Sequence, residues 1–308
     1  MSKNYKNNFR KAFSLIEISI VVLVIGILIA GISSGIDLYS DFVISKARNL
    51  TTNSRVGRIS DLNLWLETTT DKSFLTAEKY DQAPISNWNG INLISSNIVS
   101  ATQTNSNYKP KYILNGLNGL PVIRFEGKDT DNPQYSDYMN LPDEVVPYGD
   151  SDYSVFIVAK KTNNNDSANI VLSGGSVGTT SSIRAMNIFG FTTTNKALNY
   201  WYPTSSKLES SVNSIIANNF YITEFFYDKN ITANRSIYIN GSKVVEGDKG
   251  SRESTKNGNY IGRRSDYFTN YFDGDLAELI VYNKALTNSE RKSVAEYLSR
   301  KWNIKINN

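Results

Sequence analysis

The sequence predicts a mostly β protein with a long N-terminal α-helix, an antiparallel two-sheet sandwich and a C-terminal helix. Three observations lead to this prediction. An unbroken apolar run covers residues 13–36, short β-type runs separated by turn residues fill the chain from residue 61 onward, and a helix-capping pattern precedes an apolar stripe near the C-terminus. The 308 residues are 40% hydrophobic, which supplies a sizeable core beyond the helix.

The composition excludes several classes of site. The chain contains no cysteine and no histidine, which excludes a disulfide framework, Cys/His zinc sites and Ser-His-Asp or Cys-His catalysis. Four basic residues account for the whole net charge of +4, and all of them precede Phe13: Lys3, Lys6, Arg10 and Lys11. Because the rest of the chain is balanced in charge, we do not expect a nucleic acid partner.

The apolar run reads FSLIEISIVVLVIGILIAGISSGI. A helix of about 24 residues is about 36 Å long, which is enough to span a bilayer. Its only charged residue is Glu17. The basic residues ahead of it place the N-terminal end in the cytoplasm. The residues after Ile32 fit a signal-peptidase site poorly, so we expect the segment to be retained.

The stretch Lys11-Ala12-Phe13-Ser14-Leu15-Ile16-Glu17, continued by the apolar run, resembles the signature of type IV prepilins and type II secretion pseudopilins. The resemblance implies a leader of residues 1–12, cut by a prepilin peptidase between Ala12 and Phe13, and N-methylation of Phe13. Ala12 replaces the usual glycine, so we expect slower cleavage. The resemblance also implies that Glu17 neutralises the new amine of a neighbouring pilin subunit. A carboxylate tolerated near the membrane interface is the alternative.

Beyond residue 36 the chain becomes polar but keeps part of an apolar face. We expect the helix to continue as a stem to about residue 60, with the Asn/Thr/Ser cluster at residues 49–54 as its weak point. A solvated linker is the alternative. The predicted division is therefore a transmembrane and stem helix of pilin type over residues 13–60 and a sandwich domain over residues 61–308.

The sandwich is predicted from local patterns. The clearest β-type runs cover residues 121–126, 153–159, 220–227 and 277–282. Asn240-Gly241 lies between two further runs and suits the type I′ turn of a hairpin. Thr287-Asn-Ser-Glu290 matches a capping box, and it is followed by an apolar stripe of Val294, Leu298 and Trp302. We expect this C-terminal helix to pack on the sandwich.

Several stretches of this region resemble a concanavalin-like (laminin G-like) jelly-roll domain. They are Leu64-Trp65-Leu66, residues 108–127, residues 153–160, the Asn240-Gly241 hairpin and, most specifically, residues 272–286 with the helix after them. The resemblance implies binding of a glycan or a surface protein more often than catalysis. A fold does not by itself fix a function.

One acidic run on a predicted strand has a catalytic alternative. Asp273-Gly-Asp275-Leu-Ala-Glu278 resembles the paired-carboxylate strand of laminarinase-type β-glucanases. Retaining hydrolysis needs two carboxyl groups about 5–5.5 Å apart, and a β-bulge would be needed to bring Glu278 to the face of Asp273. We interpret these acids as structural and predict that the chain is not an enzyme.

Candidate ligand residues are weaker. Aromatic side chains that suit stacking on a sugar ring are Trp201, Tyr267 and Tyr271. For Trp201, alternating burial in a strand is an equally good explanation. We predict no cofactor. A calcium site at the rim of the sandwich is an alternative use of the loop aspartates Asp129, Asp131 and Asp152, which are also ordinary turn formers.

Together these features predict a type IV pilin-like filament subunit, present in low copy number, that displays a lectin-like adhesive domain. The precursor would cross the bacterial inner membrane once with its N-terminus in the cytoplasm, and the mature chain would enter a periplasmic or extracellular filament. Two alternatives are a type II secretion pseudopilin that contacts exported substrate and a membrane-tethered glycan hydrolase.

Overall fold

The computed structural model describes residues 14–92, 98–127, 136–162, 169–175, 186–202, 206–232, 234–247, 254–265 and 270–307. The chain divides into two compact units, Met1–Ser45 and Lys46–Asn308. The second unit is called the head below. Helix α1 (Leu15–Asn53) contains nearly all described residues of the first unit, and its last two turns belong to the head.

Helix α1 begins with an apolar segment. Leu15–Ile32 has a mean hydropathy of 2.9 and is exposed throughout, and among the described residues it is the one helical stretch long and apolar enough to cross a membrane. A secretory signal sequence near the N-terminus meets the same criterion. Length and composition therefore fit a membrane anchor as well as a signal sequence.

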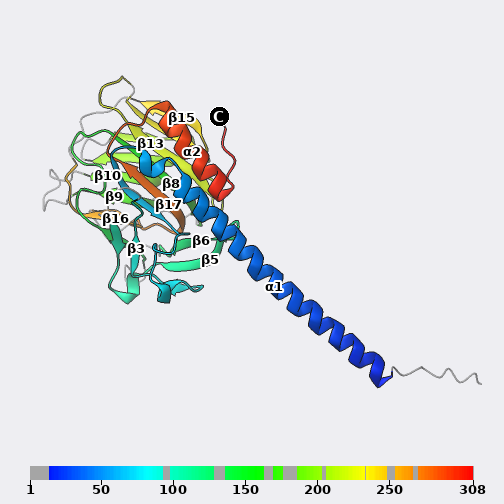
Figure 1. Ribbon diagram of the computed structural model, residues 1–308. Coiled ribbons are helices and arrows are strands. Elements are labelled where there is room, and N and C mark those ends of the chain that lie inside the picture. Colours follow the sequence, from blue (N-terminus) through cyan, green and yellow to red (C-terminus); the bar gives the residue numbers. More distant parts are fainter. Residues whose placement is uncertain are drawn as a thin grey trace, which may run out of the picture. The chain divides into compact units, whose positions relative to one another are not determined.

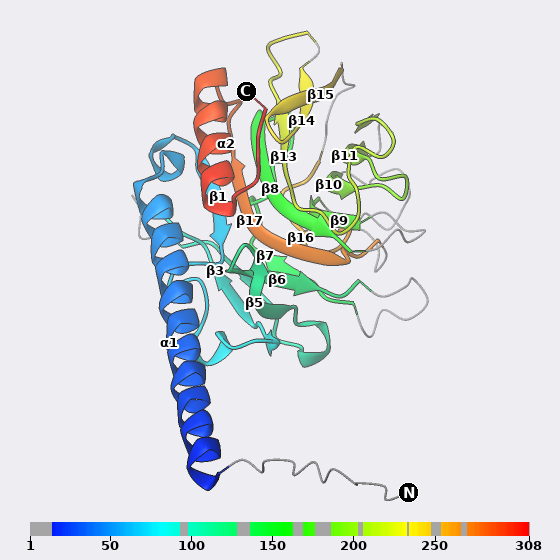
Figure 2. The ribbon, with the colours of Figure 1, turned by 90° about the vertical axis from the view of Figure 1, so that its right-hand side faces the viewer.

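The head is a sandwich of two antiparallel sheets (Figures 1 and 2). The strands of sheet A, in spatial order, are β15 (Ser242–Gly247), β14 (Arg235–Ile239), β13 (Tyr221–Tyr227), β8 (Tyr153–Lys161), β17 (Gly274–Tyr282), β6 (Leu120–Phe125), β5 (Lys111–Leu117) and β2 (Ala83–Pro84). Strand β1 (Leu62–Glu67) pairs with the second half of β17, beyond the part that pairs with β6.

Sheet B lies against sheet A. Its strands, in spatial order, are β12 (Ser206–Glu209), β11 (Ala197–Tyr202), β10 (Met186–Phe191), β9 (Asn169–Gly174), β16 (Asn259–Ile261), β7 (Met139–Leu141), β4 (Ser100–Thr102) and β3 (Asn87–Asn89). Short 3-10 helices connect some of these elements: η1 (Val56–Arg58), η2 (Thr76–Glu78) and η3 (Ser106–Tyr108). The prediction of a jelly-roll-like sandwich is confirmed.

Alternate residues of facing strands form the core between the sheets. Val155 and Ile157 of β8 point inward from sheet A, and Leu172 and Phe189 of sheet B belong to the same buried cluster. Because side chains alternate along a strand, the residues between them point to the outer faces. The outer face of each sheet therefore has to be covered or solvated.

Helix α2 (Asn288–Trp302) covers part of the outer face of sheet A (Figure 2). The predicted capping box is present, with Thr287 accepting a hydrogen bond from the backbone of Glu290 and Glu290 bonding back to the backbone of Thr287. The predicted stripe of Val294, Leu298 and Trp302 is fully buried. The Asn240-Gly241 hairpin is also confirmed, with positive φ at both turn residues.

The stem helix ends earlier than predicted, at Asn53 rather than near residue 60. The hydroxyls of Thr51 and Thr52 and the amide of Asn53 donate to backbone carbonyls four residues back, and Ser54 donates to the carbonyl of Thr51. Side chains of this kind compete with the helical hydrogen bonds that would continue the helix. The polar cluster predicted as a weak point is the place where the helix stops.

A buried ion pair under helix α2 predicts a pH dependence. Glu224 of β13 is fully buried and accepts from Arg291 at 2.9 Å. Burial raises the pKa of Glu224 to about 7, although Arg291 opposes the shift. The side chain of Glu224 therefore makes its full contribution to stability below pH 4.5. We expect the free energy of unfolding to fall by about 3 kcal/mol as the pH rises from there through 7.

Urea unfolding of wild type and Glu224→Gln at pH 5 and pH 8 measures this effect. The variant should gain stability relative to wild type as the pH rises, because an amide does not ionise. A difference between the two proteins that stays constant from pH 5 to pH 8 would contradict the raised pKa.

Candidate ligand-binding face and a buried acidic cluster

The acidic run of β17 is folded into the interior. A bulge does interrupt the pairing of β17 with β8 between Leu276 and Glu278, and it turns Glu278 to the outer face of sheet A while Leu276 and Leu279 point into the core. Asp275 and Glu278 are both 0% exposed. The bulge that the resemblance to β-glucanases requires is present, but Glu278 is buried there.

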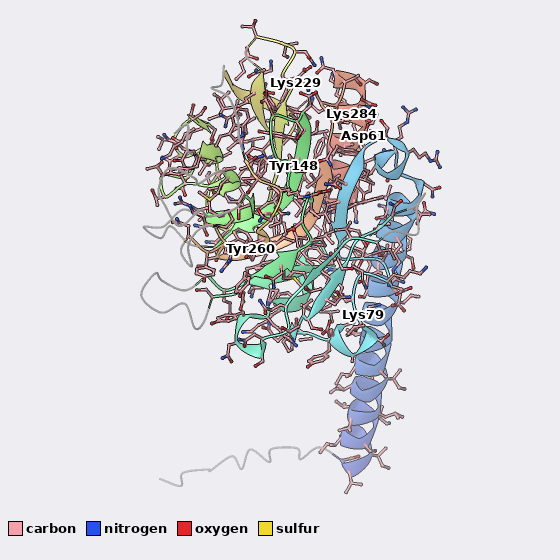
Figure 3. All side chains as sticks on the ribbon, turned by 90° about the vertical axis from the view of Figure 1, so that its left-hand side faces the viewer. Asp61, Lys79, Tyr148, Lys229, Tyr260 and Lys284 are labelled. Atoms are coloured by element: carbon pink, nitrogen blue, oxygen red, sulfur yellow. The ribbon has the colours of Figure 1, made fainter. Side chains whose placement is uncertain are left out.

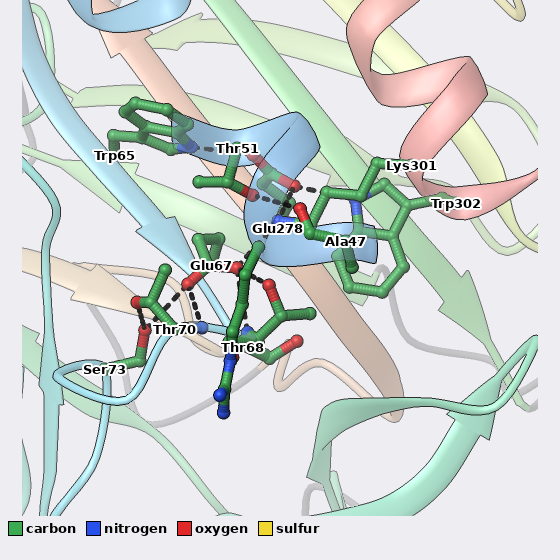
Figure 4. A network of polar contacts seen from close by, with 12 residues as sticks. Ala47, Thr51, Trp65, Glu67, Thr68, Thr70, Ser73, Glu278, Lys301 and Trp302 are labelled. Carbon is green, nitrogen blue, oxygen red and sulfur yellow. Dashed lines mark hydrogen bonds and ion pairs between the residues drawn. The ribbon is translucent and has the colours of Figure 1, made fainter. Parts of the chain in front are cut away.

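Glu278 lies directly across the sheet from Glu67 of β1, so two buried carboxylates face each other. Lys301 of helix α2 bridges them, with Nζ 2.7 Å from Glu67 and 3.0 Å from Glu278 (Figure 4). The other donors to Glu278 are buried side chains: Trp65 Nε1 at 2.7 Å, Trp302 Nε1 at 2.7 Å and Tyr297 Oη at 2.8 Å. Glu278 is thus held by four donors.

Glu67 is surrounded in a similar way. It accepts hydrogen bonds from the backbone of Thr69 and Thr70 and from the hydroxyl of Ser73 (Figure 4). Burial by itself would raise the pKa of Glu67, but the charge and hydrogen bond of Lys301 and the bonds from Thr69 and Thr70 outweigh it and lower the pKa to about 2. Both carboxylates are therefore committed to structure, with no face open to a substrate.

The same cluster fixes the end of helix α1. Ala47 and Thr51 are buried in the head, and the hydroxyl of Thr51 lies 3.1 Å from the hydroxyl of Tyr297. Burial raises the pKa of Tyr297 well above its usual value, and Glu278 and Glu67 add to this shift. Tyr297 therefore stays neutral and links Thr51 to Glu278.

The remaining acids of the run also have structural partners. Asp275 makes a two-point contact with the guanidinium of Arg124, at 2.7 and 3.0 Å, and lies 2.7 Å from Nζ of Lys160. Asp273 accepts from the hydroxyl of Thr162 at 2.8 Å. These contacts support the structural interpretation of the acidic run.

Of the residues predicted for processing and assembly, the structure describes only Glu17. Ala12 and Phe13 lie outside the described residues, whereas Glu17 lies in the first turn of α1. Glu17 accepts a hydrogen bond from the backbone of Ser14 at 2.8 Å, and the hydroxyl of Ser14 accepts from the backbone of Glu17. This reciprocal cap satisfies two backbone donors at the helix start.

The predicted aromatic platforms behave differently from one another. Trp201 is fully buried, packs edge-on against Tyr227 and carries the guanidinium of Arg235 over its ring at 4.0 Å, so it offers no exposed face to a sugar. Tyr267 lies outside the described residues. Tyr271 is 6% exposed and lies beside Tyr138, at the edge of the cluster described below.

The calcium site at the rim of the sandwich stays a prediction. Asp129 and Asp131 lie outside the described residues, and Asp152 accepts a hydrogen bond from the backbone of Lys229 at 2.8 Å. Within the described parts of the chain there is no group of three or more acidic side chains placed to hold a metal ion.

An open polar row crosses the outer face of sheet B. In four neighbouring strands the residues of the core are Ile261, Met139, Ala101 and Trp88. Because side chains alternate along a strand, the residue next to each of these points to the outer face. Four such residues are direct cross-strand partners: Tyr260 pairs with Asn140, Asn140 with Thr102 and Thr102 with Asn87. Asn140 and Thr102 are exposed, and Tyr260 and Asn87 are half-buried. This set is called the polar row below.

An aromatic cluster adjoins one end of the polar row. Arg263 is 5% exposed, and its guanidinium lies 3.8 Å from the ring of Tyr260, labelled in Figure 3, and 4.6 Å from that of Tyr138. The rings of Tyr108 and Tyr138 are 5.3 Å apart. Stacking on a buried guanidinium holds Tyr260 in one orientation, so the row ends on a rigid, half-exposed aromatic ring.

These residues were missed from the sequence. The available signal was the alternation Tyr138-Met139-Asn140-Leu141, in which apolar residues separate an aromatic and an amide side chain. That pattern indicates an outward-facing pair on one strand. It does not indicate which strands lie alongside, and hence not that Tyr260 and Thr102 flank Asn140.

Comparison with known proteins agrees with the fold. Residues 133–290, more than half of the chain, match the family model described as the Concanavalin A-like lectin/glucanases superfamily. No curated protein matches the sequence. Solved structures match at low identity.

Three of these structures illustrate the match. The Ruminococcus gnavus IT-sialidase CBM40 bound to alpha2,3 sialyllactose has 16% identity and a TM-score of 0.41 over 48% of this chain and 84% of that chain. A Trypanosoma rangeli sialidase complex has 13% identity and a TM-score of 0.46 over 85% of this chain and 39% of that chain. A leech intramolecular trans-sialidase has 14% identity and a TM-score of 0.39 over 52% of this chain and 24% of that chain. At these values the likeness concerns the fold alone.

The prediction that the chain is not an enzyme is corrected by these findings. The matched family includes glucanases by its description, so the match does not exclude an enzyme. The fold therefore does not separate binding from catalysis. The family match and the two-sheet architecture agree on one conclusion: this chain belongs to the Concanavalin A-like lectin/glucanases superfamily.

Proposed function

We propose that the chain is a type IV pilin-like filament subunit, present in low copy number, whose lectin-like head binds carbohydrate at the cell surface. The apolar part of α1 would anchor the precursor in the bacterial inner membrane, with prepilin peptidase and other pilin subunits as partners. The observation that carries the proposal is one uninterrupted helix: α1 begins at the residues of the prepilin-like signature and ends inside a lectin-like domain.

The anchoring part of the proposal is supported by the exposed apolar segment Leu15–Ile32 and by the basic residues before it. The carbohydrate-binding part is supported by the superfamily match and by the polar row, whose aromatic and amide side chains are of the kind that bind sugar rings and hydroxyl groups. In this proposal Ala12 and Phe13 form the processing site, and Glu17 pairs with the amine of a neighbouring subunit.

Replacing Glu17 with alanine is expected to leave membrane insertion intact and to reduce filament incorporation by about tenfold or more. The variant removes the partner of a buried amine, and 1.4 kcal/mol of lost pairing corresponds to a tenfold change. Filaments are sheared from cells, and the content of this chain is measured by quantitative mass spectrometry.

Two further variants serve as controls. Ser14→Ala weakens the helix cap but keeps the Glu17 carboxylate, and Asp41→Ala removes an exposed acid of the same helix outside the apolar segment. Both should incorporate close to wild-type levels. Equal loss in Ser14→Ala and Glu17→Ala would assign the effect to capping, and normal incorporation of Glu17→Ala would contradict the pairing with a neighbouring amine.

A further inference from the structure

We infer that the polar row formed by Tyr260, Asn140, Thr102 and Asn87 is the carbohydrate-binding site of the head and that it takes a neutral oligosaccharide. This inference rests on the proposed carbohydrate-binding function and adds the site and the chemical class of its ligand. It is carried by three observations: the continuity of the row, its unused hydrogen-bonding groups and its lack of charge.

The row is continuous because its members are direct cross-strand partners in the order β16, β7, β4 and β3. Neighbouring strands lie about 4.8 Å apart, so four side chains span roughly 14 Å. A short oligosaccharide lying across the strands would therefore touch all four side chains. A single sugar would fill only part of the row.

The row presents hydrogen-bonding groups that the head does not use. Among the described residues, no hydrogen bond is made with four groups of the row: the hydroxyls of Tyr260 and Thr102 and the side-chain carbonyls of Asn140 and Asn87. The amide of Asn140 is fixed by its bond to the backbone carbonyl of Thr102 at 3.1 Å, and that of Asn87 by Asn89 at 2.6 Å. Both carbonyls are thereby oriented as acceptors for sugar hydroxyls.

Tyr260 supplies the apolar part of the site. Arg263 and Tyr138 pack against its ring and keep it in place, so stacking a sugar on it would cost little side-chain entropy. An aromatic ring with a few fixed polar groups beside it is the usual composition of a small-ligand site.

The four side chains of the row carry no charge. The cation that contacts its aromatic end, Arg263, is 5% exposed and lies against the rings of Tyr260 and Tyr138. A carboxylate on the ligand would lose water without meeting an exposed cation of the row, which is unfavourable. The row therefore favours a neutral sugar over an acidic one.

The test uses the full-length chain in detergent on an array that carries neutral cello-, malto- and galacto-oligosaccharides and sialyllactose. Wild type should bind a neutral oligosaccharide. Tyr260→Ala should weaken that binding by about tenfold or more, because an anchoring aromatic ring is lost. Tyr260→Phe should retain most of the binding because it keeps the ring.

Two exposed positions guard against misfolding of the Tyr260 variant. Asn140→Ala should weaken binding several-fold, and Thr102→Glu should abolish it by placing a charge in the row; both sites are on the surface. Tyr80→Ala removes a tyrosine that is 59% exposed outside the row and should bind as wild type.

The outcomes separate the two claims. Binding of neutral sugars that is unchanged in Tyr260→Ala, Asn140→Ala and Thr102→Glu would overturn the row as the site and leave the proposed function standing. Binding of sialyllactose alone would overturn the neutral class. Failure of the folded chain to bind any saccharide would contradict the proposed carbohydrate-binding function itself.

Discussion

Replacing Lys301 with methionine is expected to destabilise the head by about 3–5 kcal/mol. Lys301 is fully buried and is the cation that bridges Glu67 and Glu278. Without it, two buried carboxyl groups would face each other across β1 and β17 without the cation that now bridges them. Breaking a buried pair by removing one partner costs this much because the remaining charge is uncompensated.

Chemical denaturation of the purified chain measures the change, and Lys292→Met is the matched control. Lys292 lies on the same helix but is exposed, so its replacement should change stability by less than about 0.5 kcal/mol. The triple variant Lys301→Met, Glu67→Gln, Glu278→Gln should recover part of the loss, because no ionised carboxylate remains. Equal stability of Lys301→Met and Lys292→Met would refute the bridging role.

Removing residues 46–60 is expected to cost the head about 4 kcal/mol, which lowers its melting temperature by roughly 10 °C. Ala47 and Val56 are buried in the head, and the carbonyl of Val56 accepts a hydrogen bond from Tyr282 at 2.9 Å. Deletion would also remove Thr51 from beside Tyr297. The comparison is between fragments 46–308 and 61–308, followed by thermal unfolding.

This comparison tests the domain boundary that the sequence predicts at residue 61. A 61–308 fragment as stable as 46–308 would show that the last turns of α1 contribute nothing to folding of the head. Thr51→Val in the longer fragment isolates the hydroxyl contact with Tyr297 from the apolar burial. We expect that variant to lose about 1 kcal/mol.

Features that depend on neighbours in sequence were predicted well. Positive φ at Asn240-Gly241 and the reciprocal bonds of Thr287 and Glu290 require only a few adjacent residues. The end of the stem helix depended on the same kind of local competition: the cluster at residues 49–54 was predicted as a weak point, but the helix was expected to continue to about residue 60.

Which aromatic side chains face outward was not predictable from the sequence, because burial decides it. Trp201 and Tyr260 lie on sheet B in similar aromatic surroundings, yet Trp201 faces the core and Tyr260 faces outward. A change of one position along a strand reverses the face. Composition alone could not distinguish them.

The sequence by itself determined the apolar helix, the hairpin, the C-terminal cap and the sandwich class, because each follows from hydrophobic periodicity or turn chemistry over a short segment. Only the tertiary structure decided that Glu67, Glu278 and Lys301 meet in the interior and that Tyr260, Asn140 and Thr102 form a row on the surface. Both arrangements depend on which distant strands pair, in what register, and on whether a helix covers the face above them. Those choices are made by long-range hydrogen bonding and burial, which no local pattern encodes.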